Sequence, residues 1–189
     1  MRFYLASASP RRAELLKQVG IDHEVIIPDV EEKIDQDLPP GQLAVLLASL
    51  KARAVADRLN KGLVLAADTL VIHNNKAIGK PRDRAEAREM LQLLSGDHHL
   101  VITGLCIINL DEGREASSFS ETKVWMKKLA AETIDCYVES DEPLDKAGAY
   151  GIQGRAALFI EKIEGCYFNV VGLPLSLLDD LLKQTHYKL

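Results

Sequence analysis

No stretch of this 189-residue sequence is apolar for long enough to span a membrane. A membrane-spanning helix needs about 20 predominantly apolar residues. The N-terminal apolar run, Phe3-Tyr4-Leu5-Ala6, is far shorter and directly follows Arg2. A secretory signal would also need a longer apolar core after its basic residues. We therefore expect a cytoplasmic protein that has neither a signal peptide nor a membrane partner.

Cysteine is also scarce. Cys106, Cys136 and Cys166 are odd in number and lie far apart in the sequence. Their spacing does not match the closely spaced cysteines of zinc sites, and an odd count does not suit a disulfide framework. The sequence thus predicts reduced, buried thiols in a cytosolic protein.

An excess of positive charge is missing as well. The net charge of −5 argues against broad electrostatic binding to nucleic acid or anionic lipid, but it leaves room for a local basic site. The sequence contains no GxxxxGK[ST] loop, no dinucleotide-binding glycine pattern, no repeats and no low-complexity linker. With 47% hydrophobic and 27% charged residues, we expect one ordinary domain over residues 1–189.

A short basic turn, LASASPRR, lies near the N-terminus. Ser9 is a suitable helix N-cap, and Pro10 suits the first helical position. Arg11 and Arg12 then fall in the first helical turn, where the helix dipole disfavours cations by up to about 1 kcal/mol. A bound anion would remove this conflict, and Ser7 with the two guanidinium groups could cradle a phosphate. A solvated basic turn explains the local pattern equally well.

Two charged residues interrupt patterns that are otherwise apolar. Lys51 lies beside the apolar face of a helix expected over 42–60, so it either extends along the surface to water or reaches into a cleft. Asp68 shares one face of the most apolar strand, over 63–73, with Val64, Ala66, Leu70 and Ile72. A buried carboxylate is costly unless it is paired, bound to metal or neutralised. We therefore interpret Asp68 as a functional residue.

Two loops carry further candidates. In GKPRD (79–83), Asp83 with Glu86 resembles a capping box, which leaves Lys80 as the better site residue. In DEPLDKAGAYGIQG (141–154), the glycines permit close approach to a ligand, and Gln153 lies among them. The adjacent Glu31 and Glu32 would ordinarily be a solvated acidic loop.

Hydrophobic periodicity and turn residues predict a mixed α/β chain. Strands are expected over 3–6, 23–27, 63–73, 76–79, 99–110, 115–126, 156–163 and 166–171. Helices are expected over 11–19, 42–60, 83–94, 131–139 and from Pro174. His98 and His99 belong to no metalloprotease motif, and we expect them at the surface or at a strand edge.

Several of these segments together resemble the Maf family of nucleoside triphosphate pyrophosphatases. In chain order they are LASASPRRAELL (5–16), VEEK (30–33), KARAVA (51–56), AADT (66–69), GKPRD (79–83), SGDHHLVITG (95–104), DEPLDKAGAYGIQG (141–154) and VVGLP (170–174). The resemblance implies a Maf/HAM1-like α/β fold, with a long twisted mixed sheet, flanking helices and two lobes around a nucleotide cleft. It also implies a cytoplasmic enzyme, often homodimeric, that cleaves a nucleoside triphosphate to the monophosphate and pyrophosphate with Mg²⁺ or Mn²⁺.

Within the family, SPRR, ADT and GIQG are similar to the branch that acts on dTTP and UTP. The branch that acts on 7-methyl-GTP has tryptophan at the position of Arg11 and different residues at those of Thr69 and Gln153. The resemblance implies that Asp68 is the general base and that Glu32 and Asp68 hold the metal. The implied triphosphate ligands are Ser7, Arg12, Lys51 and Lys80, and the implied base-reading residues are Arg11, Thr69 and Gln153.

Two other interpretations are kept at this point. One is a pyrophosphatase for 7-methyl-GTP or damaged purine nucleotides. The other is a nucleotide-binding regulator of septum formation, a role associated with the family. An intact Asp68 favours catalysis over regulation alone.

Overall fold

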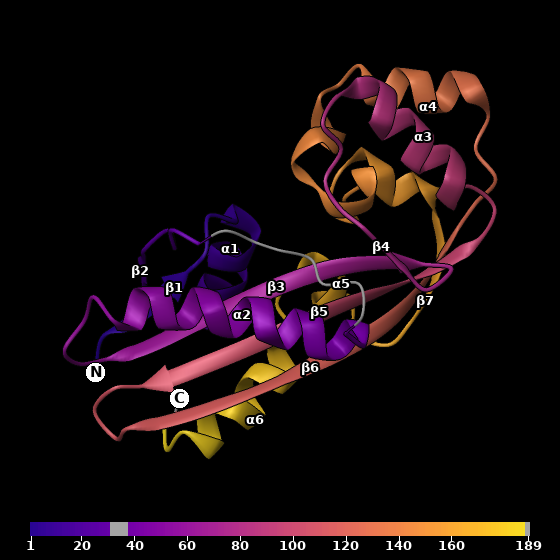
Figure 1. The fold of residues 1–189 in the computed structure, drawn as a ribbon. Helices are drawn as coiled ribbons and strands as arrows, with labels where there is room; N and C mark the ends of the chain where they lie inside the picture. The colour runs from indigo at the N-terminus through magenta and orange to yellow at the C-terminus, as the bar shows by residue number, and fades with distance from the viewer. Residues whose placement is uncertain (31–37, 188–189) are drawn as a thin grey trace. The chain divides into compact units, whose positions relative to one another are not determined.

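The computed structural model describes residues 1–30 and 38–187. Within this part of the chain, seven strands form one sheet in the order β2-β1-β3-β5-β6-β7, and β4 pairs with β3 (Figure 1). The strands are β1 (Phe3–Ala6), β2 (Glu24–Val25), β3 (Leu63–His73), β4 (Lys76–Ile78), β5 (His98–Asn109), β6 (Arg114–Met126) and β7 (Ile160–Glu164). β1 runs parallel to β2 and β3, whereas the β3–β4 and β6–β7 pairs are antiparallel. The sheet is therefore mixed, as predicted.

Helices flank this sheet. The α-helices are α1 (Pro10–Gln18), α2 (Pro40–Ala56), α3 (Arg84–Leu94), α4 (Ala131–Val138), α5 (Tyr167–Val171) and α6 (Leu175–Gln184). Three 3₁₀ helices are η1 (Glu142–Asp145), η2 (Ala147–Ala149) and η3 (Arg155–Phe159). No helix of the described residues is both long and apolar enough to cross a lipid bilayer.

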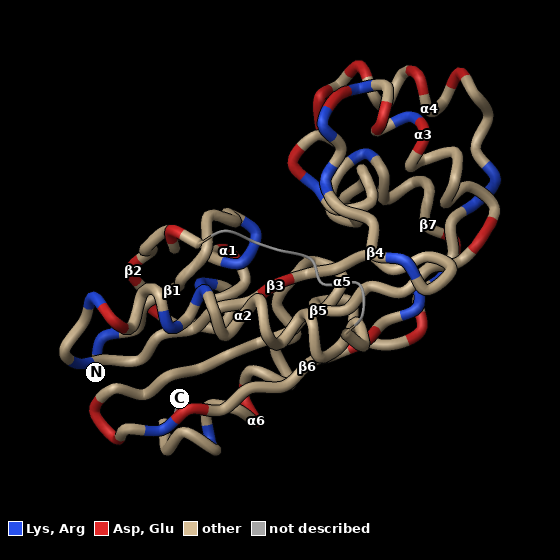
Figure 2. The backbone as a smooth tube through the Cα atoms, viewed as in Figure 1, with Lys and Arg blue, Asp and Glu red and all other residues tan. Residues whose placement is uncertain are grey.

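The described chain divides into two compact units. Unit 1 comprises residues 1–69, 103–120 and 172–189, and unit 2 comprises residues 70–102 and 121–171. Acidic and basic residues are interspersed along the backbone of each unit (Figure 2).

In unit 1, α2 packs on the sheet through small side chains. Ala48, Ala52 and Val55 form a buried cluster with residues of β1, β3 and β5. Gly104 of β5 makes this close approach possible, because a Cβ there would lie 2.3 Å from the backbone of Ala44. The face of β3 toward α2 carries Val64, Ala66 and, further along, Asp68. Because α2 packs on this face of β3, the Asp68 side chain is directed toward α2.

Unit 2 has its own apolar core. Side chains from α3, α4, η2 and η3 pack on parts of β3, β5 and β6, among them Leu91, Tyr137 and Phe159. The rings of Tyr137 and Phe159 meet edge to face, with centroids 5.1 Å apart. This core supports the 141–154 loop, because Ala149 and Tyr150 belong to it.

Most predicted elements are confirmed, including the β3–β4 turn, where Asn74 and Asn75 both have positive φ. One strand prediction was wrong: residues 167–171 form α5. A short apolar run does not by itself distinguish strand from helix. Here Asn169 is buried and its Nδ2 donates to the carbonyl of Val101 at 2.8 Å, a contact with β5 that local sequence does not reveal. Residues 156–159, also expected as strand, belong to η3.

Three side-chain predictions also need correction. His99 is buried, because its Nε2 lies 2.6 Å from the Tyr150 hydroxyl inside the unit 2 core. Among the cysteines only Cys106 is buried, since Cys136 is exposed and Cys166 is intermediate. All three are free thiols, as predicted.

Candidate active site

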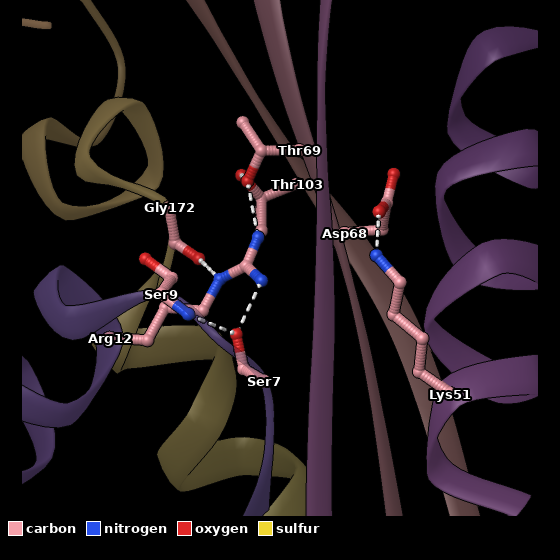
Figure 3. Close-up of polar contacts among 8 residues, drawn as sticks. All are labelled: Ser7, Ser9, Arg12, Lys51, Asp68, Thr69, Thr103 and Gly172. Atoms are coloured by element: carbon pink, nitrogen blue, oxygen red, sulfur yellow. Dashed lines mark hydrogen bonds and ion pairs between the residues drawn. The ribbon is translucent and has the colours of Figure 1, made fainter. Parts of the chain in front are cut away.

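Arg12 is the centre of a polar network in unit 1. It lies in the first turn of α1, and its side chain is almost completely buried. Its Nη1 donates to Ser7 Oγ at 3.0 Å, its Nε to the carbonyl of Gly172 at 2.9 Å, and its Nη2 to Thr69 Oγ1 at 3.1 Å (Figure 3). All three acceptors are neutral oxygens. These three hydrogen bonds therefore orient the guanidinium group without neutralising its positive charge.

The turn between β1 and α1 brings Ser7 to this position. Ser9 occupies the N-cap in extended conformation, but its side chain makes no capping bond. Instead, the Ser9 backbone N–H donates to Ser7 Oγ at 3.2 Å. Ser7 therefore connects the helix N-terminus to Arg12. The predicted N-cap position of Ser9 is confirmed, although its side chain makes no capping hydrogen bond. Arg11 lies beside Arg12 in the same turn and is half-buried.

Thr69 and Thr103 complete this network. Their hydroxyl oxygens, on β3 and β5, are 3.0 Å apart, and Thr103 is fully buried. Gly172 contributes only its carbonyl. The sequence analysis assigned no role to Thr103 or Gly172. Thr103 carried a usable signal, since it is a polar residue inside an apolar strand, but a backbone carbonyl leaves no such mark.

Lys51 and Asp68 form a second polar contact in unit 1. The Lys51 ammonium of α2 donates to Asp68 Oδ1 of β3, and both side chains are about nine-tenths buried. This ion pair compensates the cost of placing a carboxylate inside an apolar strand. The Lys51 side chain therefore does not extend along the surface to water, which was one of its two interpretations. Figure 3 shows the pair on the opposite side of β3 from Thr69 and Arg12.

Lys80 and Gln153 belong to unit 2. Lys80 is exposed and follows β4, and Gln153 is exposed near the end of the 141–154 loop. The two loops contact each other, because the Gly148 N–H donates to the Gly79 carbonyl at 3.0 Å. Asp83 caps α3, as predicted, and accepts from the Glu86 N–H at 2.9 Å.

Glu32, the predicted metal ligand, lies outside the described residues. Within residues 1–30 and 38–187, no three His, Cys, Asp or Glu side chains are grouped as a metal site would require. Asp68 supplies an oxygen donor of the kind that Mg²⁺ and Mn²⁺ prefer.

A family model described as "Maf-like protein" matches residues 2–185. The chain belongs to the Maf family. Maf-family relatives named "dTTP/UTP pyrophosphatase" align over nearly its full length. The protein from Carboxydothermus hydrogenoformans is 50% identical over 99% of this chain and 100% of its own. The one from Methanosarcina barkeri is 50% identical over 95% and 92%, and the one from Acetivibrio thermocellus is 48% identical over 97% and 94%.

The fold of this Maf-family chain is similar to that of the Staphylococcus aureus Ham1 protein. The alignment has a TM-score of 0.50 at 17% identity and covers 97% of this chain and 99% of the other. At this identity the likeness concerns the fold alone, and it agrees with the predicted Maf/HAM1-like architecture.

Proposed function

We propose that this Maf-family chain hydrolyses dTTP and UTP to the nucleoside monophosphate and pyrophosphate. The observation that carries the proposal is the buried Asp68 carboxylate, which interrupts an apolar strand and is paired with Lys51. Relatives about half identical over nearly the whole chain, named dTTP/UTP pyrophosphatase, support the substrate class. No observation favours the regulator or the purine-directed enzyme.

In the proposed reaction, water attacks the α-phosphorus of the triphosphate. A new P–O bond forms from the water oxygen, and the bond between the α-phosphorus and the oxygen bridging to the β-phosphorus breaks. Asp68 accepts the water proton, and pyrophosphate leaves with the bonding electron pair. The ion pair with Lys51 orients the Asp68 carboxylate, as a general base must be oriented.

Phosphate binding is assigned to cationic and hydroxyl groups. Arg12 is held by three contacts near the N-terminus of α1, where the helix dipole also favours anions. A guanidinium in a defined orientation can bind phosphate oxygens through paired N–H donors. Ser7 lies beside it, and we assign Lys51 and Lys80 to the same triphosphate.

A divalent cation, Mg²⁺ or Mn²⁺, is part of the proposal. Asp68 and Glu32 would hold it, since Mg²⁺ commonly takes one or two carboxylates together with substrate phosphates. The ion would neutralise negative charge that develops on the phosphate oxygens. Arg11, Thr69 and Gln153 are proposed to read the base, and a homodimer stays a prediction.

Product analysis in ¹⁸O-labelled water tests this proposal. With UTP and Mg²⁺ or Mn²⁺, we expect label in the monophosphate and unlabelled pyrophosphate as the other product. Label in orthophosphate, with UDP formed, would contradict attack at the α-phosphorus. Steady-state kinetics across dTTP, UTP, CTP, ATP, GTP and 7-methyl-GTP test the substrate class, and faster hydrolysis of GTP or 7-methyl-GTP than of UTP would contradict it.

A further inference from the structure

Gln153 lies in a tight turn. The Gly154 N–H donates to the Gly151 carbonyl at 3.2 Å, which closes a four-residue turn with Gln153 at its third position. Gln153 is exposed, so its side chain is accessible to a ligand. The direction of the amide therefore depends on what holds the two ends of the turn.

The Glu142 side chain binds the C-terminal end of the 151–154 turn, which we call its far end. One carboxylate oxygen, Oε2, accepts the Arg155 backbone N–H at 3.2 Å, directly after the turn. The other, Oε1, accepts the Tyr137 hydroxyl at 3.1 Å. Tyr137 is buried in the unit 2 core, where its ring packs on Phe159. The Glu142 carboxylate thus ties the turn to the core.

Gly154 leaves space for this carboxylate. A Cβ at Gly154 would lie 1.9 Å from Glu142 Oε1, a distance that no real contact tolerates. The φ of Gly154 is −101°, which other residues also adopt. Glycine is therefore required here for space and not for its backbone angle. The Glu142 carboxylate therefore occupies the space that a side chain at position 154 would need.

The near end of the turn is supported by the same segment. Lys146 Nζ donates to the Glu142 carbonyl at 2.5 Å and to Asp145 Oδ1 at 2.6 Å. Its Cε would lie 2.7 Å from a Cβ at Gly151. The pKa of the Tyr137 hydroxyl is raised mainly by burial and then by the Glu142 charge, whereas a backbone hydrogen bond from Gly151 lowers it. The Tyr137 hydroxyl therefore interacts with Gly151 at the near end of the turn and with the Glu142 carboxylate, which binds the far end.

We propose that Glu142 is a positioning residue that holds the Gln153 turn in the orientation needed to read the nucleotide base. The inference rests on the proposed function, in which Gln153 contacts that base. Glu142 does not touch the substrate in this account. It acts through the Arg155 N–H and through its contact with Gly154. Displacement of a binding group by about 1 Å can lower catalytic efficiency by about a hundredfold.

The test compares Glu142→Ala and Glu142→Gln with Glu139→Ala, which removes a nearby exposed carboxylate as a control. For Glu142→Ala we expect a fall of about tenfold to a hundredfold in kcat/KM for UTP, and a loss of most of the preference for UTP over GTP. Glu142→Gln should recover most of both, because an amide oxygen can accept the Arg155 N–H and an amide N–H can donate to Tyr137. Glu139→Ala should match the wild type.

Gly154→Ala provides an independent variant of the same contact. In the wild-type background, its new methyl group should displace the Glu142 carboxylate and lower the UTP preference. In the Glu142→Ala background the clash is gone, so the same substitution should have little further effect. Faster hydrogen exchange of the Arg155 amide in Glu142→Ala, but not in Glu139→Ala, would report the loosened turn without any activity measurement.

The outcomes separate the inference from the proposed function. If the wild type itself does not prefer UTP over GTP, the proposed function fails and the inference fails with it. If the wild type prefers UTP and Gln153→Ala removes that preference while Glu142→Ala retains it, only the inference is overturned. An equal loss for all nucleotides in Glu142→Ala would assign Glu142 to folding alone and would also overturn it.

Discussion

Asp68 and Thr69 are adjacent in β3, and their side chains leave opposite faces of the strand. Asp68 meets Lys51 of α2, whereas Thr69 accepts Arg12 Nη2 at 3.1 Å and lies 3.0 Å from Thr103 Oγ1 (Figure 3). Two consecutive strand residues therefore connect two helices, one on each face of β3. Each contact can be disrupted separately, which makes their contributions distinguishable.

Asp68→Asn should abolish most turnover and leave the fold intact. The amide keeps the size of the carboxylate and can still accept from Lys51, but it is a very poor proton acceptor. Loss of a general base costs about 10²–10⁴-fold in rate, and weaker metal binding would add to this. Steady-state kinetics with UTP, with the melting temperature as control, check this. Near-normal activity in the folded variant would remove Asp68 from the catalytic role.

Lys51→Met should destabilise the protein more than Asp68→Asn does. Removing the ammonium leaves the Asp68 carboxylate buried without this partner, and breaking a buried ion pair from one side costs about 3–5 kcal/mol. The double variant Lys51→Met/Asp68→Asn should recover part of that loss, since it has no buried charge at this position. Urea unfolding gives all three free energies. A Lys51→Met variant as stable as the wild type would contradict the paired-burial account.

Arg12→Lys should weaken substrate binding although it keeps the charge. An ammonium cannot reproduce the planar fork that reaches Ser7, Thr69 and Gly172 together. Charge-assisted hydrogen bonds contribute about 1.5–3 kcal/mol each, so we expect a loss of about tenfold to a hundredfold in kcat/KM for UTP. Arg53→Lys is the matched control, because Arg53 forms an exposed pair with Glu115. Equal kinetics of the two variants would argue against a binding role for Arg12.

His99 should make stability depend on pH. Burial, together with the nearby His73 and His98, lowers the pKa of His99 to about 4. The unfolded chain, with a His pKa of about 6.5, binds more protons than the folded one between these values, so stability falls as pH falls through this window. From pH 7 to pH 4.5 this residue alone should cost about 2 kcal/mol.

The measurement for His99 is urea unfolding at pH 7 and pH 4.5. His99→Gln should lose about 2 kcal/mol less than the wild type between these two values. His98→Gln is the comparison variant: the His98 side chain is about half exposed, and its charge lowers the pKa of His99 less than burial and His73 do, so this substitution should change the pH dependence much less than His99→Gln. If His99→Gln loses as much unfolding free energy as the wild type between pH 7 and pH 4.5, groups other than His99 cause the pH dependence.

Arg11→Trp combined with Gln153→Glu should reduce the preference for pyrimidine nucleotides. Uracil and thymine present an N3–H donor between two carbonyl acceptors, which an amide and a guanidinium can pair with. Each lost hydrogen bond costs about 1–3 kcal/mol, so the kcat/KM ratio of UTP to GTP should fall by about tenfold or more. The melting temperature should change little, because Gln153 is exposed and Arg11 is half-buried. An unchanged ratio would remove both residues from base recognition.

Much of the candidate site could be predicted from local patterns. Asp68 was recognisable because a carboxylate interrupts an alternating apolar face, and Arg12 because a cation occupies a helix N-terminus that favours anions. The opposite orientation of Thr69 agrees with the two-residue period of a strand. Thr103 carried a similar signal, but its partner Thr69 is far from it in the chain and could not be assigned locally. The contact of the Gly172 carbonyl with Arg12 left no local signal at all.

The sequence by itself determined the main strands and most helix boundaries, because periodicity, capping residues and turn glycines act over a few neighbouring positions. The family was indicated separately, by the resemblance of several motifs in chain order. Only the tertiary structure decided which charges pair and which polar groups are buried. Lys51 could have faced water until the packing of α2 on β3 placed it against Asp68. Residues 167–171 fit a strand pattern locally but form a helix whose Asn169 is buried and hydrogen-bonded to the carbonyl of Val101. Such outcomes depend on long-range packing, which no local pattern encodes.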